Sequence, residues 1–358
     1  MSIQPLVDIP IPALIKALPK TDLHIHQEEV ARLERVVACR QGRPPHDWRE
    51  SAQRLMAKTS AGKNRLLDMY APDSHLDLSG EPADDPEYII ATMTNALEEG
   101  ATNGAMLLEL RFGAGGLALT RPDFMTLFRE AERRIQMRYP HFCAEAIGYL
   151  RLINDPAQLL TVERQLERCL QLADKGLAGL DLITAPYDTE ANPALWAIAY
   201  DWAERAADAG LGITIHAGEF STANLAAALK TPGLQRVGHA VYAATEPSLL
   251  DQLAQSGVTV ECSLSCNVVL GAVPSYEAHP IRRFVACGIP VTINTDDPVR
   301  VWTTIGREYA IAHLLGFSPN KLFEVTRHAV QVAFTSPERK KKLLIELDKW
   351  ATSNLHAN

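Results

Sequence analysis

Short apolar segments alternate along the chain with longer amphipathic ones. Eight of the short segments are β-prone and have the length of buried strands. We predict these strands at Thr21–His26, Ala105–Arg111, Cys143–Leu150, Leu180–Ile183, Ile213–His216, Arg236–His239, Val258–Cys262 and Pro290–Asn294. Between them, apolar residues recur at three- and four-residue spacing, as in Pro122–Arg138 and Pro193–Ala209, and this spacing predicts helices.

Strands that alternate with helices pair in parallel through right-handed crossovers, and eight strands close a (β/α)₈ barrel. The alternative is an open doubly wound sheet, which would carry a phosphate-binding glycine fingerprint after the first strand. Here Gln27 and Glu28 follow that strand, and no glycine does. We therefore predict an α/β fold, a (β/α)₈ TIM barrel, with residues 1–358 in a single domain.

The stretch from about residue 31 to residue 100 looks mainly helical and is too long for one crossover. We expect a helical insertion, about 31–100, after the first strand, packed over one mouth of the barrel. Whether it moves as a lid stays open. The last segment, Pro319–Trp350, predicts two helices, and its Glu338–Lys342 charge cluster predicts a solvated helix face.

Composition excludes several classes of protein. Hydrophobic residues make up 47% and charged residues 22%, as in ordinary globular proteins. The net charge of −8 gives no field that would attract nucleic acid or an anionic membrane. No apolar run reaches the length of a membrane span, and prolines interrupt the first residues where a signal peptide would be apolar. We expect a cytoplasmic protein with a small-molecule partner, whose oligomeric state stays open.

The scattered cysteines and most histidines suggest structural roles. The six cysteines form no CxxC pair, so we expect free, mostly buried thiols. His279 is expected to start a helix or to shape a pocket. We expect no metal ligand among the histidines in helical or loop segments, which are His46, His75, His141, His313, His328 and His356.

Other ionisable residues fall where predicted strands end, and in a barrel these ends converge on one site. They are His24 and His26 after the first strand, His216 and Glu219 after the fifth, His239 after the sixth, and Asp296 and Asp297 after the eighth.

Four of these residues have the chemistry of a metal site. His24 and His26 are two apart on a strand, so both imidazoles point to one face. With His216 and Asp296 they supply three nitrogens and one oxygen, a set suited to Zn²⁺ with room for a water. A hydrogen-bonded polar layer without an ion is the alternative, and burying that many ionisable groups would be costly. We predict one Zn²⁺ per chain.

Three further residues suit proton transfer and substrate binding. Glu219 lies beyond a small Ala–Gly turn, and desolvation would raise its pKa so that it delivers a proton at neutral pH; the alternative is a first-turn helix carboxylate. His239, after Gly238, would orient or deprotonate the water, or be a core histidine. Asp297 would face the ligand, or cap the following helix.

The motifs that contain these residues resemble a known family. HIH at 24–26, HAGE at 216–219, Gly238–His239, Asn267 with GAVPSYEAHP at 271–280, and TINTDDP at 292–298 resemble the ordered motifs of the adenosine/adenine deaminase family of zinc amidohydrolases. LELRFG at 108–113 and AFTSPERKKKLL at 333–344 resemble its second strand and its C-terminal helix. The resemblance covers about residues 15 to 345.

The resemblance implies a barrel with one Zn²⁺ bound by His24, His26, His216 and Asp296. It implies that Glu219 protonates the purine ring nitrogen next to the reacting carbon. His239 would position a metal-bound hydroxide, and Asp297 would hydrogen-bond another ring nitrogen. The implied reaction is hydrolytic deamination of adenosine, adenine or a related aminated purine, in which the metal-bound hydroxide attacks and ammonia leaves.

The sequence departs from the family at substrate-facing positions. Gln27–Glu29 stands where the family usually has Leu-Asp-Gly, so Glu28 would meet a ribose hydroxyl. Thr184 falls where the family has a glycine whose backbone contacts the purine, and Ser263 replaces a proline after the seventh strand. The resemblance therefore leaves the exact substrate open.

Other activities remain as alternatives. A mononuclear zinc amidohydrolase could act on a different C–N or ester substrate. Relatives with two metals use a lysine from the fourth strand, whereas Lys175 precedes that strand and no lysine ends it. An inactive zinc-bearing scaffold predicts damage at Glu219, His239 or Asp297, and all three are intact. Zinc deaminases of nucleic-acid bases use HxE with PCxxC, which this chain lacks.

Overall fold

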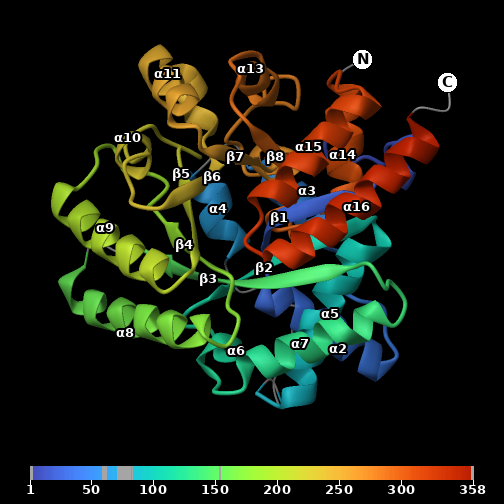
Figure 1. The fold of residues 1–358 in the computed structure, drawn as a ribbon, viewed down its shortest axis with the longest axis horizontal. Coiled ribbons are helices and arrows are strands. Elements are labelled where there is room, and N and C mark those ends of the chain that lie inside the picture. Colours follow the sequence, from blue (N-terminus) through green and yellow to red (C-terminus); the bar gives the residue numbers. More distant parts are fainter. Residues whose placement is uncertain (1–2, 59–62, 71–81, 83, 153–154, 356–358) are drawn as a thin grey trace.

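The computed structural model describes residues 3–58, 63–70, 82, 84–152 and 155–355. Its centre is an eight-stranded parallel sheet in the order β1 to β8, curved into a barrel (Figure 1). The strands are β1 (Lys20–His26), β2 (Ala105–Gly113), β3 (Cys143–Arg151), β4 (Gly179–Ile183), β5 (Gly212–Ala217), β6 (Leu234–His239), β7 (Thr259–Cys262) and β8 (Val291–Ile293). The barrel is confirmed, and each predicted strand lies within two residues of its observed bounds.

Strand β8 meets β1 through its carboxyl end. The amide of Asp296 donates to the carbonyl of His24 at 2.7 Å, and the amide of His26 donates to the carbonyl of Asp296 at 2.8 Å. One isolated bridge, between Ile25 and Asp296, therefore brings the two ends of the sheet together. It also places the Asp296 side chain beside the two histidines of β1.

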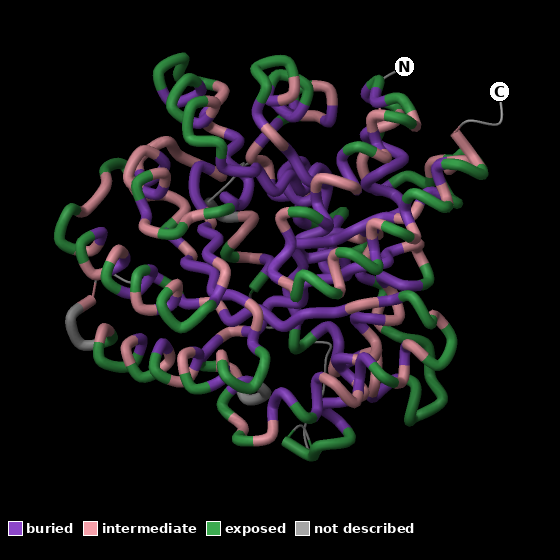
Figure 2. The backbone as a smooth tube through the Cα atoms, in the orientation of Figure 1, coloured by how far each residue is buried: buried purple, intermediate pink, exposed green. Residues whose placement is uncertain are grey.

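Helices surround the sheet, and Figure 2 shows buried backbone at the strands and exposed backbone on the outer helix faces. The longer helices of this layer are α5 (Pro86–Thr102), α7 (Phe124–Gln136), α8 (Pro156–Ala173), α9 (Pro193–Asp208), α11 (Pro247–Ser256), α14 (Ile305–Leu314), α15 (Pro319–Val332) and α16 (Pro337–Asn354). Shorter elements are α1 (Ala13–Ala17), α6 (Leu117–Thr120), α10 (Leu225–Ala228), η1 (Val241–Thr245), α12 (Leu264–Val269) and α13 (Ile281–Ala286).

Helix α9 illustrates how the sequence sets these elements. The Asn192 side chain accepts the amides of Ala194 and Leu195, and Pro193 occupies the first turn, where its missing N–H costs nothing. Trp196 and Trp202 lie on its buried face. The helix ends before Gly210, whose φ of 84° is a conformation that glycine adopts readily.

The segment expected to form an insertion has two parts. Helices α3 (Trp48–Ala57) and α4 (Lys63–Met69) contribute Leu55 and Met69 to an apolar cluster with Val269 and Leu270, which follow β7 at the carboxyl mouth of the barrel. Helices α2 (Glu29–Gln41) and α5 instead lie in the outer layer, where α5 packs against α7 and β2. Among the described helices of this segment, α3 and α4 therefore cover the mouth, and α5 serves as the crossover helix between β1 and β2.

Helices α15 and α16 confirm the two helices expected at the C-terminal end, and each begins at a serine cap. The charge cluster at the start of α16 differs from a simple solvated face. Arg339 is half-buried and donates to the carboxylates of Glu132 at 2.8 Å and Glu145 at 3.1 Å. It thereby holds α16 against α7 and β3, while Lys341 and Lys342 are exposed.

All six cysteines are free, as predicted, but only Cys169, Cys262 and Cys266 are buried. Cys39 and Cys287 are exposed, because each lies at the end of a helix that faces solvent. No helix in the described part of the chain is both long and apolar enough to cross a membrane.

Candidate active site

Four side chains converge at the carboxyl mouth of the barrel. Nε2 of His24 lies 2.9 Å from Nε2 of His216, and Nε2 of His26 lies 3.2 Å from the same atom. Oδ1 of Asp296 lies 3.3 Å from Nε2 of both His24 and His26. Zinc–nitrogen bonds of about 2.0–2.1 Å in a tetrahedral site would hold ligand atoms about 3.3 Å apart. The residues have the spacing of one zinc coordination sphere.

The opposite ring nitrogens show that lone pairs face the centre of this group. Nδ1 of His24 lies 2.9 Å from Oε2 of Glu261, and Nδ1 of His216 lies 2.9 Å from Oδ2 of Asp181. A carboxylate accepts, so each Nδ1 donates, and each neutral ring presents an unprotonated Nε2 to the other. Two acceptors at 2.9 Å repel each other unless a proton or a metal ion lies between them, and a metal ion would contact both nitrogens and Asp296 at once, so the donor set fits a metal ion.

The pKa values agree with three of the four histidines at the mouth being neutral. Burial, together with neighbouring charges, lowers the pKa of His216 and lowers those of His26 and His239 well below the usual range. His24 differs, because the carboxylates of Asp296 and Glu261 outweigh its burial and raise its pKa to about 9. A bound cation would take the place of that proton.

A buried network of charges supports the histidines from below. Arg111 on β2 donates to Asp181 on β4 at 2.7 Å and to Glu261 on β7 at 2.5 Å. Arg236 on β6 donates to the other oxygen of Glu261 at 2.6 Å and also pairs with Glu109 on β2. These side chains are fully buried, and the arginines, opposing the effect of burial, keep the pKa values of Asp181 and Glu261 well below normal.

The sequence interpretation missed this network. These charged residues lie in the middle of apolar strands. A charged residue at such a position has to be paired when it is buried, and this was the one indication of the network in the sequence. Their partners come from strands far apart in the chain, so the sequence alone did not pair them.

Glu219 lies at the same mouth, anchored by an amide. Oε1 accepts a hydrogen bond from Nδ2 of Asn267 at 3.2 Å, and Oε2 lies 3.8 Å from Nε2 of His239. Burial, followed by the charges of Asp296 and Asp297, raises the pKa of Glu219 well above its ordinary value. The side chain is therefore held in place, and it keeps its proton to a higher pH than an ordinary glutamate does.

Asn267 also determines the tautomer of His239. The amide of Ile281 donates to Nδ1 of His279, so Nε2 of His279 carries the proton and donates to Oδ1 of Asn267 at 3.2 Å. Nδ2 of Asn267 then donates to Nδ1 of His239 at 3.1 Å. The proton of a neutral His239 is on Nε2, which faces Asp296 at 3.7 Å. His279 thus shapes the site, one of its two expected roles.

Unusual backbone conformations hold two of these residues in place. His239 and Asp296 each have a φ of 66°, a region that costs energy for a residue with a side chain. Gly238 makes room for His24, because a Cβ at position 238 would lie 2.9 Å from Cε1 of His24. Gly218, with a φ of 73°, brings the turn before Glu219 against the backbone of Ala240.

Comparison with known proteins identifies the family. The family model for adenosine deaminase matches residues 19–350. The chain belongs to the adenosine deaminase family. An adenine deaminase of Rhizobium leguminosarum bv. trifolii is 41% identical over 144 residues, which are 40% of this chain and 45% of that protein. The matched part thus spans less than half the length of this curated relative.

Solved structures share the fold of this family member. The adenine deaminase from Arthrobacter aurescens has a TM-score of 0.71 and 21% identity, over 94% of this chain and all of that chain. A Burkholderia ambifaria amidohydrolase with bound zinc has a TM-score of 0.70 and 20% identity, over 97% of this chain and 96% of that one. At these identities the comparison supports the barrel.

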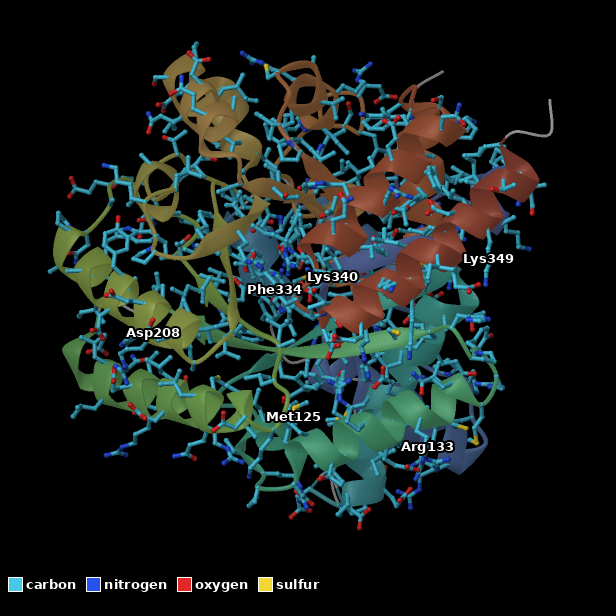
Figure 3. All side chains as sticks on the ribbon, viewed as in Figure 1. Met125, Arg133, Asp208, Phe334, Lys340 and Lys349 are labelled. Atoms are coloured by element: carbon cyan, nitrogen blue, oxygen red, sulfur yellow. The ribbon has the colours of Figure 1, made fainter. Side chains whose placement is uncertain are left out.

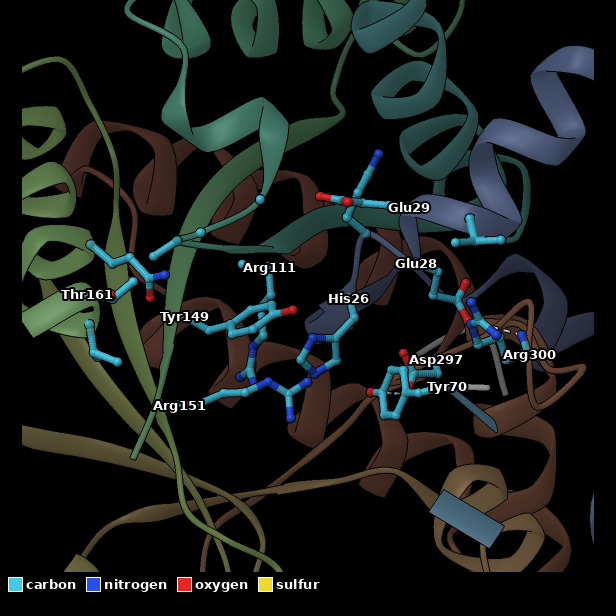
Figure 4. A pocket seen from close by; sticks show the side chains of 18 of the residues that line it. His26, Glu28, Glu29, Tyr70, Arg111, Tyr149, Arg151, Thr161, Asp297 and Arg300 are labelled. Atoms are coloured by element: carbon cyan, nitrogen blue, oxygen red, sulfur yellow. Dashed lines mark hydrogen bonds between the residues drawn. The ribbon is translucent and has the colours of Figure 1, made fainter. Parts of the chain in front are cut away.

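Two joined cavities open beside the family's motif residues. A small inner cavity of about 60 Å³ is lined by Thr184, Glu219 and His239, among others. A larger outer cavity of about 470 Å³ lies beside it, and Figure 4 shows side chains that line it. Asp297 borders both cavities, and burial, with the charge of Asp296, raises its pKa well above normal. Its carboxyl therefore faces ligand space.

Thr184 borders the inner cavity at the expected place. Its hydroxyl donates to the carbonyl of His216 at 2.7 Å, so that proton is already used. The hydroxyl oxygen keeps the capacity to accept a hydrogen bond.

Glu28 borders the outer cavity, and its carboxylate also holds the turn after β8. Its fully buried carboxylate accepts the amides of Val299 at 3.1 Å and Arg300 at 3.0 Å, and Arg32 lies 3.6 Å away. Each carboxylate oxygen thus already accepts one amide, and the contact with a ribose hydroxyl stays a prediction. Glu28 fixes the turn after β8, and the neighbouring Glu29, whose side chain is exposed, borders the outer cavity as well.

The remaining histidines lie away from these groups where the structure describes them. His46 contacts Ser51, His313 contacts the carbonyl of Phe317, and His328 contacts Thr259. His141 is exposed, whereas His75 and His356 lie outside the described residues. Lys175 is exposed in the turn before β4, at the opposite end of that strand from the mouth.

Proposed function

We propose that this chain is a hydrolytic deaminase of an adenine-type compound, such as adenosine, adenine or a related aminated purine. The observation that carries the proposal is one group of side chains, in which three histidine Nε2 atoms and Asp296 face one point beside Glu219. Membership of the adenosine deaminase family and the adenine deaminase names of its relatives support it.

We propose one zinc ion per chain, held by His24, His26, His216 and Asp296. The inward-facing lone pairs of His24 and His216 support this assignment, as does the bound zinc in the Burkholderia amidohydrolase. Zinc, when bound, would lower the pKa of a coordinated water and so supply a nucleophile at neutral pH.

Glu219 would serve as the acid. Addition of water to the carbon that bears the amine places charge on the adjacent ring nitrogen, and a protonated carboxyl can neutralise it. The raised pKa of Glu219 keeps its proton available, and the Asn267 bond fixes its direction.

His239 and Asp297 would complete the site. Nε2–H of His239 faces Asp296, where it would orient the attacking water. Asp297, whose raised pKa keeps its carboxyl protonated, would donate a hydrogen bond to a second ring nitrogen. The chain would act on its small-molecule substrate in the cytoplasm, and the six free cysteines favour a reducing compartment.

A screen for ammonia release tests this proposal. We expect ammonia from at least one adenine-type compound, and a loss of about 10²- to 10⁴-fold in kcat for Glu219→Gln, because glutamine cannot donate the proton. The variant should retain the metal of the wild type. Glu204→Gln, on the exposed face of α9, is the matched control. Products from esters or other amides alone would instead support a different amidohydrolase reaction.

A further inference from the structure

The outer cavity is larger than a purine base requires. Its volume of about 470 Å³ lies in the range typical of sites for extended small molecules, about 300–1,000 Å³. It shares His26, Tyr70, Arg151 and Asp297 with the inner cavity, so one ligand can occupy both. A base held beside Glu219 would leave the outer cavity to another part of the same molecule.

Arg151 stands in the wall between the two cavities. It is the last residue of β3, and its guanidinium lies 5.7 Å from the centre of the Tyr70 ring and 6.0 Å from that of Tyr149. Figure 4 shows the side chain extending from β3 toward His26. The two tyrosine rings therefore hold the Arg151 guanidinium at the carboxyl end of β3, on the side of His26.

This guanidinium has no carboxylate partner among the described residues. It contacts the two tyrosine rings and forms a hydrogen bond with Tyr149. The other arginines of the wall are engaged, because Arg111 pairs with two buried carboxylates, and Arg300 donates to the carbonyl of Met69 at 2.6 Å. An arginine without a partner is common on an outer surface, but Arg151 points into ligand space.

We propose that the substrate carries an anionic group, a phosphate or a carboxylate, that binds Arg151 while the reacting edge of its purine ring reaches into the inner cavity. The planar guanidinium suits either group, since both present two oxygens to its paired N–H donors. The inference rests on the proposed deaminase function and adds the class of substrate.

The rest of the outer cavity accommodates a polar ligand. Thr161, Gln158 and Gln165 on α8 supply neutral hydrogen-bonding groups to its wall. The acidic Glu29 borders the cavity at a place away from Arg151 in Figure 4, and partial burial raises its pKa above the ordinary value. Glu28 and Asp297 also border the cavity, and in Figure 4 they lie on the other side of His26 from Arg151.

Kinetics on paired substrates test the proposal. Adenosine would be compared with adenosine 5′-monophosphate and with adenosine 5′-carboxylate, using wild type, Arg151→Gln and Arg151→Lys. We expect Arg151→Gln to lower kcat/KM for one anionic compound about 10- to 100-fold more than for adenosine, as for the loss of a charged hydrogen bond. Arg151→Lys should retain part of the preference, because it keeps the charge and loses the paired donors.

A control and a binding measurement sharpen the test. Arg133→Gln changes an arginine on the outer face of α7, labelled in Figure 3, whose side chain is 60% exposed and pairs with Glu130; it should leave the ratio of the substrates unchanged. Titration of inosine 5′-monophosphate, inosine 5′-carboxylate and inosine should show the same selective loss in Arg151→Gln without turnover. Thermal unfolding would establish that each variant is folded.

The outcomes separate the two proposals. A larger loss on the phosphate identifies a phosphate site, and a larger loss on the carboxylate identifies a carboxylate site. An equal loss on charged and neutral compounds would overturn the anionic-substrate inference and leave the deaminase function intact. Absence of ammonia from every adenine compound, neutral or charged, would overturn both.

Discussion

Nδ2 of Asn267 donates a hydrogen bond to Nδ1 of His239 at 3.1 Å, and this contact determines which nitrogen of the imidazole carries its proton. The same amide donates to Glu219, and His279 fixes its orientation through Oδ1. A single neutral side chain thus positions the proposed acid and the proposed water-orienting histidine.

Replacing Asn267 with leucine should therefore impair catalysis more than binding. The two hydrogen bonds contribute about 1–3 kcal/mol together, so we expect kcat to fall about 10- to 100-fold with little change in KM. Steady-state kinetics would measure the loss, and the ring-nitrogen shifts of His239 should show a changed tautomer. Asn354→Leu, at the end of α16, is the control. An unchanged kcat would contradict the positioning role.

The alkaline limb of the pH dependence of kcat should move to higher pH in Asn267→Leu. The bond from Asn267 stabilises the charged form of Glu219, so its removal raises the pKa of Glu219 further. Activity that needs protonated Glu219 is lost as the pH rises through that pKa, and the alkaline limb of kcat should move to higher pH. A shift to lower pH would show that another group controls this limb.

Glu28 combines a structural role with a place in the wall of the outer cavity. Glu28→Ala would leave two amides without their acceptor and weaken the pairing of buried Arg32, so we expect a loss of about 2–4 kcal/mol in the free energy of unfolding. Denaturant unfolding measures this loss, with Glu29→Ala as the neighbouring control. An equal loss of kcat/KM on adenosine and adenine would indicate the structural role alone, whereas a selective loss on adenosine would support the ribose contact.

Asp181 should tune metal affinity without touching the metal. Its carboxylate holds Nδ1 of His216 and pairs with Arg111. We expect Asp181→Asn to weaken zinc binding about 10- to 100-fold, measured by competition with a chelator. Asp201→Asn, on the exposed face of α9, should bind zinc as the wild type does. Equal affinities for wild type and Asp181→Asn would show that the second carboxylate, on Glu261, suffices.

The strands and the residues at their ends could be predicted because each depends on a local pattern. The alternation at His24 and His26 predicts two imidazoles on one face, and parallel strands bring His216 and Asp296 to the same mouth. The structure places these four together. The family motifs supplied the roles, which geometry alone left open.

Other features could not be predicted because they depend on contacts between distant segments. The sequence predicts Glu28 as a ligand-facing acid, but it gives no sign that the carboxylate also accepts the amides of Val299 and Arg300, about 270 positions away. Arg111 on β2 pairs with Asp181 on β4, and the pattern of apolar residues in these two strands does not indicate that they contact each other. The sequence places helix α5 in the insertion over the barrel mouth, because the apolar face of the helix does not indicate which surface it covers.

Titration of metal-free protein with zinc, followed by ammonia release from an adenine-type compound, tests the central claim most directly. The convergence of His24, His26, His216 and Asp296 predicts that activity rises in proportion to added zinc and levels off at one ion per chain. Activity that survives complete removal of the metal, or that levels off only at two ions per chain, would contradict it.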